Sequence, residues 1–203
     1  MDRPRDRDLV RLYWPAHLRS AFEALFAIDD AMADVVSQST QPALGAIKLA
    51  WWRERLEELD QGKVPAEPRL RAAAAELLPR GITGAALAQI EPGWATLLQE
   101  TPDPEVALNR GVNLFGLAAR LLGSDPPQSI QIAGSVYAAG SLSRRRLAPE
   151  GLPAVTDSLS VPSRFRPLTG LAALARRDLA RSEPEATPGR ALVLLRHRLT
   201  GRL

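Results

Sequence analysis

The sequence contains no cysteine and only two histidines, His17 and His197, among its 203 residues. The absence of cysteine excludes disulfide bonds, thiolate zinc sites and cysteine nucleophiles. Two histidines so far apart in the chain also disfavour a multi-histidine metal site and a serine hydrolase triad. These absences direct attention to the charged side chains.

Lysine and aromatic residues are scarce as well. Lys48 and Lys63 are the only lysines, aromatic residues make up 5% of the chain, and the net charge is +3. Arginine favours planar, bidentate contact with phosphate or carboxylate. Because the arginines are spread along the chain and no nucleic-acid-binding motif is present, we expect no nucleic-acid partner.

Long hydrophobic runs are absent too. No run approaches the roughly 20 residues that a bilayer-spanning helix needs. The first residues, MDRPRDRD, do not resemble a signal peptide. We therefore expect a cytoplasmic protein, with a peripheral position at the inner face of a membrane as a further option. The length predicts a single domain over residues 1–203 with a sizeable core.

Hydrophobic periodicity predicts one helix after another, separated by proline and glycine. Helices are expected over residues 22–36, 41–59, 69–78, 105–122, 128–142, 168–179 and 190–199, with shorter ones after Asp6 or Asp8 and near Thr83. The segment Glu91-Pro92-Gly93 is expected to stop the short helix before it. Gly111 and Gly116 indicate close packing of their helix against a neighbour. No alternating pattern long enough for a strand occurs, so the predicted fold class is all-α.

The helix expected over residues 22–36 carries an acid within its apolar face. Apolar residues recur there at three- and four-residue steps and form one buried stripe. Asp29 falls in the middle of this stripe, Asp30 lies at its edge, and Asp34 has rotated toward the polar side. A buried charge costs several kcal/mol unless it is paired. We therefore expect Asp29 to point inward and to be satisfied by a base or a hydroxyl from a neighbouring helix, with Lys48 or Arg55 as the favoured partner.

The helix expected over residues 41–59 carries bases beside its apolar residues. Its apolar arc consists of Leu44, Ile47, Trp51, Trp52, Leu56 and Leu59. Lys48 and Arg55, seven residues apart, lie within this arc next to both tryptophans. They are consistent with a structural ion pair or with the wall of a polar cavity, and long basic side chains can also return their charge to water.

The segment from Ala21 to Leu59 resembles the first conserved blocks of the squalene and phytoene synthase family. The most specific block is Pro42 to Arg53, which matches Pro-x-x-Gly-x-x-[Lys/Arg]-Leu-x-Trp-Trp-Arg, and fainter similarity continues through NLFGLAARLLG and RRRLAPEGLP. The resemblance implies a helical bundle of the isoprenoid synthase type around a central cavity, somewhat truncated here. In that family, two Asp-x-x-x-Asp motifs on facing helices hold Mg²⁺ against the diphosphates of two prenyl substrates.

The sequence departs from the first of these motifs. Asp30 and Asp34 have the four-residue spacing at which two carboxylates share a helix face and can meet one Mg²⁺. When residues 26–28 are aligned with the family's Tyr-Ala-Phe, however, the two metal-binding aspartates fall on Ala33 and Ser37. Only Asp34 then coincides with an acid of the family.

The second motif is missing as well, because no two acids beyond Glu105 are three or four residues apart. The ungapped spacing from Phe26 to Trp52 resembles the branch of the family that lacks these aspartates. That branch includes proteins related to a mitochondrial respiratory complex I assembly factor. The resemblance to it implies a retained fold without condensing activity.

Two functions follow from these observations. The favoured one is a non-catalytic binding or respiratory-complex assembly protein that needs no cofactor and retains a prenyl or lipid-like ligand. Its ligand contacts are expected from Lys48, Trp51, Trp52, Arg53, Arg55, Arg144 and Arg145. The alternative is a condensing prenyltransferase acting on farnesyl or geranylgeranyl diphosphate. Its shifted catalytic motif consists of Asp29, Asp30 and Asp34, with Asp30 and Asp34 on Mg²⁺ and with Arg53, Arg55 and residues 144–146 on diphosphate.

The C-terminal segment, PGRALVLLRHRLTGRL, predicts a basic amphipathic helix. Its apolar side has Leu192, Leu195 and Leu199, and its four positive charges are Arg190, Arg196, Arg198 and Arg202. Such a helix can lie on an anionic membrane surface or contact a membrane complex. The competing expectation, which we favour, is that it docks on the core, because its leucines would otherwise face water.

Overall fold

The computed structural model describes residues 5–152, 159–181 and 183–203. These residues form ten α-helices, and their one β-type pairing is an isolated bridge between Ser160 and Arg202. The helices are α1 (Asp6–Arg11), α2 (Arg19–Ser37), α3 (Pro42–Leu59), α4 (Pro68–Glu76), α5 (Gly84–Ala88), α6 (Glu91–Ala95), α7 (Pro104–Leu121), α8 (Gln128–Arg145), α9 (Arg166–Ala180) and α10 (Pro188–Thr200). The all-α fold predicted from periodicity is confirmed.

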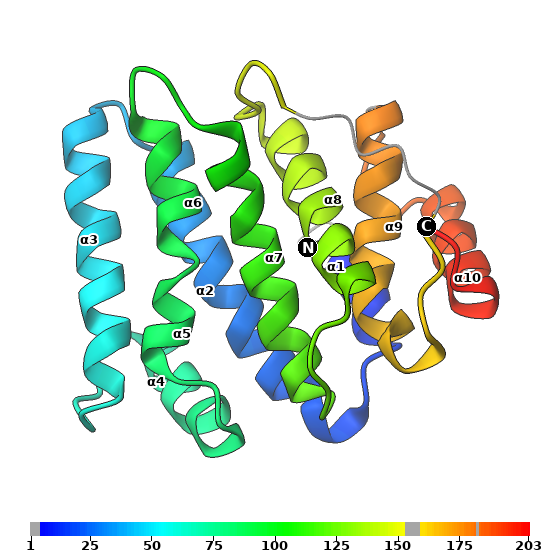
Figure 1. Ribbon diagram of the computed structural model, residues 1–203, viewed down its shortest axis with the longest axis horizontal. Helices are drawn as coiled ribbons and strands as arrows, with labels where there is room; N and C mark the ends of the chain where they lie inside the picture. Colours follow the sequence, from blue (N-terminus) through cyan, green and yellow to red (C-terminus); the bar gives the residue numbers. More distant parts are fainter. Residues whose placement is uncertain (1–4, 153–158, 182) are drawn as a thin grey trace.

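The helices lie in two layers (Figure 1). One layer runs from α3 at one edge through α5 and α6, α7, α8 and α9 to α10 at the other edge, nearly in chain order. Behind it lie α4, α2 and α1, with α2 packed against α7 and α1 packed against α9. The long helix α2 is therefore covered by other helices over most of its surface.

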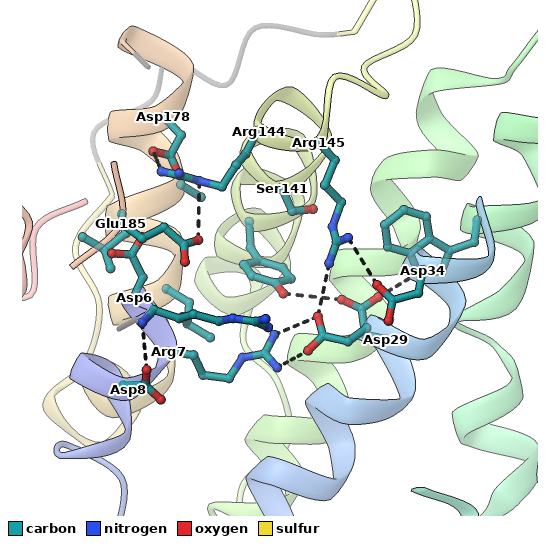
Figure 2. Close-up of a pocket in the computed structure, with 17 residues that line it drawn as sticks. Asp6, Arg7, Asp8, Asp29, Asp34, Ser141, Arg144, Arg145, Asp178 and Glu185 are labelled. Carbon is teal, nitrogen blue, oxygen red and sulfur yellow. Dashed lines mark hydrogen bonds and ion pairs between the residues drawn. The ribbon is translucent and has the colours of Figure 1, made fainter. Parts of the chain in front are cut away.

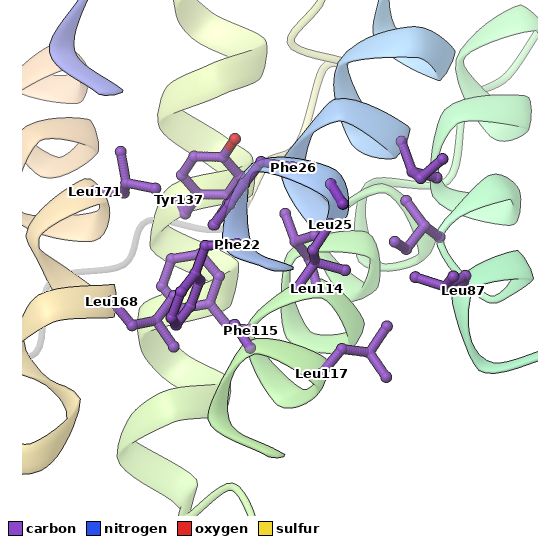
Figure 3. Packing of buried hydrophobic residues seen from close by; sticks show 14 of the residues in the cluster. Phe22, Leu25, Phe26, Leu87, Leu114, Phe115, Leu117, Tyr137, Leu168 and Leu171 are labelled. Atoms are coloured by element: carbon purple, nitrogen blue, oxygen red, sulfur yellow. The ribbon is translucent and has the colours of Figure 1, made fainter. Parts of the chain in front are cut away.

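The burial of α2 follows its predicted stripe. Between residues 21 and 34, only Glu23, Ala27, Asp30 and Asp34 keep partial exposure. Aromatic side chains fill the space beside its N-terminal half (Figure 3): the ring of Trp14 stacks on Phe22, and Phe26 meets Tyr137 of α8 edge-on. The interior beside this half of α2 is thus packed with side chains, and the partly exposed aspartates lie toward its C-terminal half.

One helix boundary differs from the prediction. Glu91-Pro92-Gly93 does not stop a helix; it begins α6, and α5 has already ended at Ala88. Proline is well suited to a first turn, where its missing N–H has no intrahelical partner to lose. Gly93 then lets α6 approach α7 closely, because a Cβ atom there would lie 2.5 Å from Arg110 Cβ. This arrangement buries Trp94 beside the site described below.

The predicted apolar arc of α3 is correct for Trp52, Leu56 and Leu59, which are buried, and wrong for Leu44, Ile47 and Trp51. Leu44, Ile47 and Trp51 are 51%, 65% and 41% exposed. The buried side of this helix consists instead of Gly45, Leu49, Trp52, Leu56 and Leu59. As an edge helix, α3 has neighbours on one side only, and Gly45 allows the close approach, since a Cβ atom there would lie 2.8 Å from Leu98 Cδ1.

Helix α10 docks on the core, as expected, but Leu192, Leu195 and Leu199 do not make the contact. Leu192, Leu195 and Leu199 are 65%, 47% and 70% exposed, whereas Leu194 and His197 face α9 and are buried. Arg190, predicted to be a surface charge, is completely buried and bonded to Asp6 and Asp178. This buried ion network orients α10 with its leucines outward.

His197 makes the docking of α10 dependent on pH. Its Nδ1 donates to the carbonyl of Arg202 at 3.0 Å, and its Nε2 lies 2.8 Å from the hydroxyl of Thr169 on α9. Burial, together with the positive charge of Arg166, lowers the pKa of His197 below its ordinary value of about 6.5. The unfolded chain therefore binds a proton more readily than the folded chain. The stability that neutral His197 provides is complete above about pH 6.5 and is lost as the pH falls toward the lower folded-state pKa.

We expect this dependence to appear as a difference between the wild-type protein and the His197→Gln variant. The free energy of unfolding of the wild type should fall more steeply than that of the variant when urea titrations are repeated at decreasing pH below about 6.5. The exposed His17 supplies the matched control, and His17→Gln should keep the wild-type slope. Parallel curves for the wild type and His197→Gln contradict the assignment.

Candidate functional site

A cavity of about 510 Å³ is lined by residues of α1, α2, α8 and α9 (Figure 2). Most of its lining is charged. The acids are Asp6, Asp8, Asp29, Asp30, Asp34, Asp178 and Glu185, and the bases are Arg5, Arg7, Arg144 and Arg145. Leu171, Leu174 and Ala175 of α9 and Trp94 of α6 add apolar surface. The cavity thus combines many opposite charges with one apolar wall.

Asp29 lies at the buried end of this cavity, as the helical stripe predicts, with 2% exposure. Its partner is neither Lys48 nor Arg55 but Arg110 of α7, which is also fully buried. Nη1 of Arg110 donates to both carboxylate oxygens of Asp29, at 2.7 and 2.8 Å. Lys48 cannot serve because it lies on the exposed side of α3, and Arg55 pairs with Glu58 at 2.9 Å instead.

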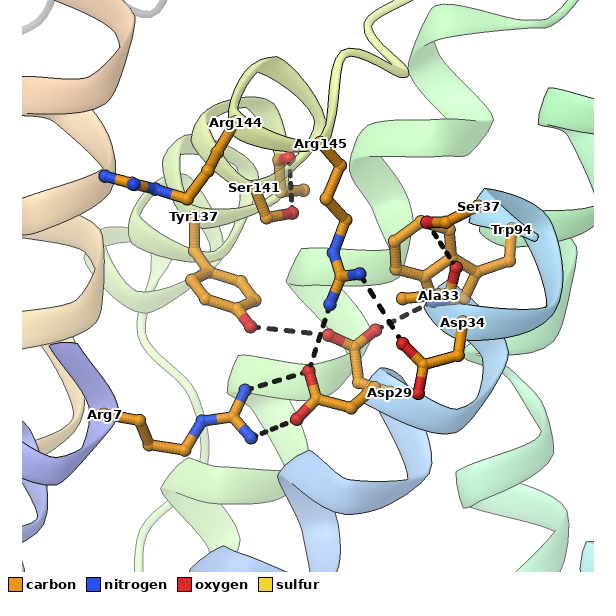
Figure 4. Close-up of polar contacts among 12 residues, drawn as sticks. Arg7, Asp29, Ala33, Asp34, Ser37, Trp94, Tyr137, Ser141, Arg144 and Arg145 are labelled. Atoms are coloured by element: carbon orange, nitrogen blue, oxygen red, sulfur yellow. Dashed lines mark hydrogen bonds and ion pairs between the residues drawn. The ribbon is translucent and has the colours of Figure 1, made fainter. Parts of the chain in front are cut away.

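Two aromatic residues, Trp94 and Tyr137, complete the environment of Asp29 (Figure 4). Nε1 of Trp94 donates to Asp29 at 2.9 Å, and the hydroxyl of Tyr137 donates to it at 3.4 Å. Burial and the charge of Asp29 raise the pKa of Tyr137, so the phenol stays protonated and remains a donor. The guanidinium of Arg110 lies 4.0 Å from the ring centroid of Trp94, and its Nη2 donates to Ser141 at 2.6 Å. Asp29 is therefore held by three donors and has a structural role.

Asp30 and Asp34 face the cavity but are bound by arginines. The guanidinium of Arg7 makes a bidentate contact with Asp30, with Nη2 3.2 Å from Oδ1. Arg145 of α8 spans both acids, with Nη2 3.4 Å from Asp30 Oδ1 and Nη1 3.8 Å from Asp34 Oδ1. Two arginine side chains thus lie against the two carboxylates that are spaced to share a metal ion.

The residues at the family's metal-binding positions offer no carboxylate. Ala33 is buried, and the hydroxyl of Ser37 donates to the carbonyl of Ala33 at 2.8 Å within α2. Across the described ranges, no group of three or more acids, histidines or cysteines is placed to hold a metal ion. Mg²⁺ requires several oxygen ligands, and an arginine beside a carboxylate competes for the same oxygens. The donor set therefore does not fit the magnesium cluster of a condensing enzyme.

A second ion network forms the opposite wall of the cavity. Arg144 donates to Asp178 of α9 through Nε at 3.1 Å, and Asp178 also accepts from Arg190 of α10 at 2.6 Å. Arg190 donates in turn to Asp6 of α1 through Nε at 2.8 Å. Arg144 is thereby committed to helix packing, which limits its availability for a ligand.

The structure divides the predicted site residues into two groups. Asp29, Asp30, Asp34, Arg144 and Arg145 meet at the cavity. The ligand contacts predicted on α3 do not line the cavity. They are Lys48, Trp51, Trp52, Arg53 and Arg55. Of these, Trp52 belongs to the core.

Arg53 contributes to a separate contact on α6. Its Nη1 lies 3.8 Å from Oε2 of the buried Glu91. Burial raises the pKa of Glu91, and Arg53 partly offsets this effect. Arg53 therefore has a partner in the packing of α3 against α6, away from the cavity.

Sequence reasoning missed Arg7, Arg110, Tyr137 and Asp178. The burial of Arg110 could have been predicted from the sequence, because it lies three residues after Ala107 and four before Leu114 on the apolar face of α7. An arginine in that stripe requires a buried acid, as Asp29 requires a buried base. Arg7, by contrast, lies in a short helix with no periodic pattern long enough to define a face.

The comparison with protein families agrees with the resemblance seen in the sequence. The squalene/phytoene synthase family model matches residues 3–89, which contain α1 to α5 and the aspartates of α2. Residues 3–89 are thus similar to the squalene/phytoene synthase family. No curated protein and no solved structure gives a significant match. Within the described ranges, none of the helices is long and apolar enough to cross a membrane.

Proposed function

We propose that this protein is a squalene/phytoene synthase-like protein without condensing activity that acts as a binding or respiratory-complex assembly protein. The main supporting observation is the pairing of Asp30 and Asp34 with Arg7 and Arg145, because a shifted metal-binding motif on α2 would need these carboxylates free. The assembly role rests on the resemblance of the Phe26 to Trp52 spacing to the branch without these aspartates. A cytoplasmic location, with peripheral contact to a membrane, is part of the proposal.

The cavity supports retention of a small ligand more readily than of two prenyl diphosphates. Its charged lining residues are seven acids and four arginines, and the adjacent Arg110 and Arg190 bring the bases to six. This balance gives no excess of positive charge for a diphosphate. The apolar wall from Leu171, Leu174 and Ala175 can contact part of a prenyl or lipid-like chain. We therefore expect a ligand that is at most weakly anionic.

One observation favours a second function, condensation of prenyl diphosphates. Asp30 and Asp34 share the accessible stripe of α2 and face the same cavity as Arg144 and Arg145. If the arginines released these acids, Asp30 and Asp34 could hold Mg²⁺ and the arginines could contact diphosphate. No second acidic pair faces them, which makes this function the less supported of the two.

Release of diphosphate distinguishes the two functions. Purified protein incubated with farnesyl or geranylgeranyl diphosphate and Mg²⁺ should release no more diphosphate than the Asp30→Asn/Asp34→Asn variant. Prenyl products are expected to be absent from extracts of the reaction. Mg²⁺-dependent turnover that disappears in the variant would overturn the proposal and establish the shifted motif.

A further inference from the structure

The exposed face of α10 is apolar at its centre. Leu192, Leu195 and Leu199 lie at i, i+3 and i+7, so their side chains share one face of the helix. They are 65%, 47% and 70% exposed. The opposite face is already occupied, because Arg190, Leu194 and His197 are buried against the rest of the protein. Helix α10 is the last helix of its layer (Figure 1), and the exposure of these leucines shows that none of the described helices covers this apolar face.

The surroundings of this face are basic. Residues 159–203 contain nine arginines and three acids, which are Asp178, Glu183 and Glu185. All three acids are engaged: Asp178 by Arg190, Glu183 by Arg177, and Glu185 more distantly by Arg144. Within the described part of the chain, no ion pair is made by Arg164, Arg166, Arg196, Arg198 or Arg202. The leucines are thus accompanied by several uncompensated positive charges.

The basic residues lie at the leucines and at the C-terminal end of α10. Arg196 is one turn from both Leu192 and Leu199 on the helix. Nη1 of Arg166 donates to the carbonyls of Arg198 and Leu199, at 2.9 Å each, and so places its charge at the end of α10. The guanidinium of Arg198 lies 4.6 Å from the ring centroid of Tyr13. These contacts keep positive charge at one end of the apolar face.

A comparison with α3 shows that exposed apolar residues alone do not define such a face. Leu44, Ile47 and Trp51 are exposed on α3, but that helix has three bases and three acids in total. Its charge is therefore balanced, whereas α10 has arginines and no acid. The two helices lie at opposite edges of the same layer (Figure 1), so they can be tested independently.

We propose that the exposed face of α10 binds the surface of an anionic phospholipid membrane. The leucines insert at the boundary between headgroups and acyl chains, and the unpaired arginines contact lipid phosphates. The arginines of α10, a helix without acids, complement a negatively charged surface and would be repelled by a positively charged one. This inference rests on the peripheral membrane contact in the proposed function and assigns that contact to α10, outside the charged cavity.

Co-sedimentation with vesicles tests the proposal. The full chain should bind vesicles of phosphatidylglycerol and phosphatidylcholine at low salt, and binding should weaken as salt screens the charges. Arg196→Gln/Arg202→Gln should lower the partition coefficient about 25-fold, since each basic residue near the surface contributes about fivefold, equivalent to about 1 kcal/mol. Leu192→Gln/Leu195→Gln/Leu199→Gln should lower it at least tenfold. All of these side chains are exposed, and circular dichroism should show wild-type helicity.

Matched controls locate the binding on α10. Ile47→Gln removes an exposed apolar residue from α3, and Arg120→Gln removes an exposed charge from α7; neither should change binding. The proposal is overturned if the folded protein does not bind at low salt, binds pure phosphatidylcholine equally well, or loses binding equally in the controls. It is also overturned if size-exclusion chromatography shows a dimer that Leu195→Gln dissociates, because a second copy then covers the face. None of these measurements involves a prenyl diphosphate, so their outcome is independent of the turnover assay.

Discussion

Replacing Asp29 with alanine is expected to lower the free energy of unfolding by about 3–5 kcal/mol, the usual cost of removing one partner of a buried ion pair. The substitution leaves the guanidinium of Arg110 charged and buried, with Ser141 as its nearest remaining partner. It also leaves the indole N–H of Trp94 and the hydroxyl of Tyr137 without their acceptor. Urea titration followed by circular dichroism measures this loss.

Related variants separate the cost of the unpaired charge from the cost of the lost side-chain volume. Asp29→Leu should lose less stability than Asp29→Ala, because leucine leaves no empty volume, although Arg110 stays unpaired in both. Combining Asp29→Leu with Arg110→Met removes both charges and should recover much of the loss. Asp34→Ala is the matched control on the same helix: its carboxylate is 45% exposed and its partners are 3.8 Å away, so we expect a change within about 1 kcal/mol. If Asp29→Ala unfolds like Asp34→Ala, the buried pair does not stabilise the fold.

The second large effect is expected at the crossing of α7 and α8. A Cβ atom at Gly111 would lie 2.0 Å from the carbonyl oxygen of Gly134, and one at Gly134 would lie 2.3 Å from the carbonyl oxygen of Gly111. Both obstacles are backbone atoms of long helices, which cannot move aside as a side chain can. Gly111→Ala should therefore lower the free energy of unfolding by about 1–3 kcal/mol or more by forcing the helices apart.

Gly116 provides the control on the same helix. The prediction that it also permits close packing is wrong, because the nearest atom to a Cβ there is Pro126 Cγ at 3.8 Å, an ordinary contact distance. Alanine at this position should raise the free energy of unfolding by up to about 1 kcal/mol through its higher helix propensity. Equal effects of Gly111→Ala and Gly116→Ala in urea titrations would show that α7 and α8 are not in backbone contact.

The fold could be predicted from the sequence where the packing of a helix is symmetric. The helix α2 is covered on most sides, so its long apolar stripe sufficed to predict the burial of Asp29 and the edge position of Asp30. The edge helices α3 and α10 carry apolar residues on more than one face, but each has neighbouring helices on one side only, so periodicity does not show which face is buried. The outcome there depends on Gly45 and Arg190, whose partners lie elsewhere in the chain.

The candidate site was less predictable because its pairs are distant in sequence. Asp29 requires a buried partner wherever it comes from, but Arg110 lies 81 residues away and Tyr137 lies 108 residues away. Periodicity identifies which side of a helix is buried and leaves open which other helix covers it. The sequence therefore favoured a base on α3, the next helix in the chain, as the partner of Asp29, whereas the structure supplies Arg110 from α7.

The link between Asp6 and Arg190 has a consequence for how the protein is made. These residues are 184 positions apart, so their contact closes a loop that contains α2 to α9. During translation α1 is synthesised before α10, which carries its buried partner. Until then, Asp6 and Asp178 lack the cation that joins them, and α1 cannot complete its packing against α9 and α10. Helix α1 is thus made well before the helix that secures its position.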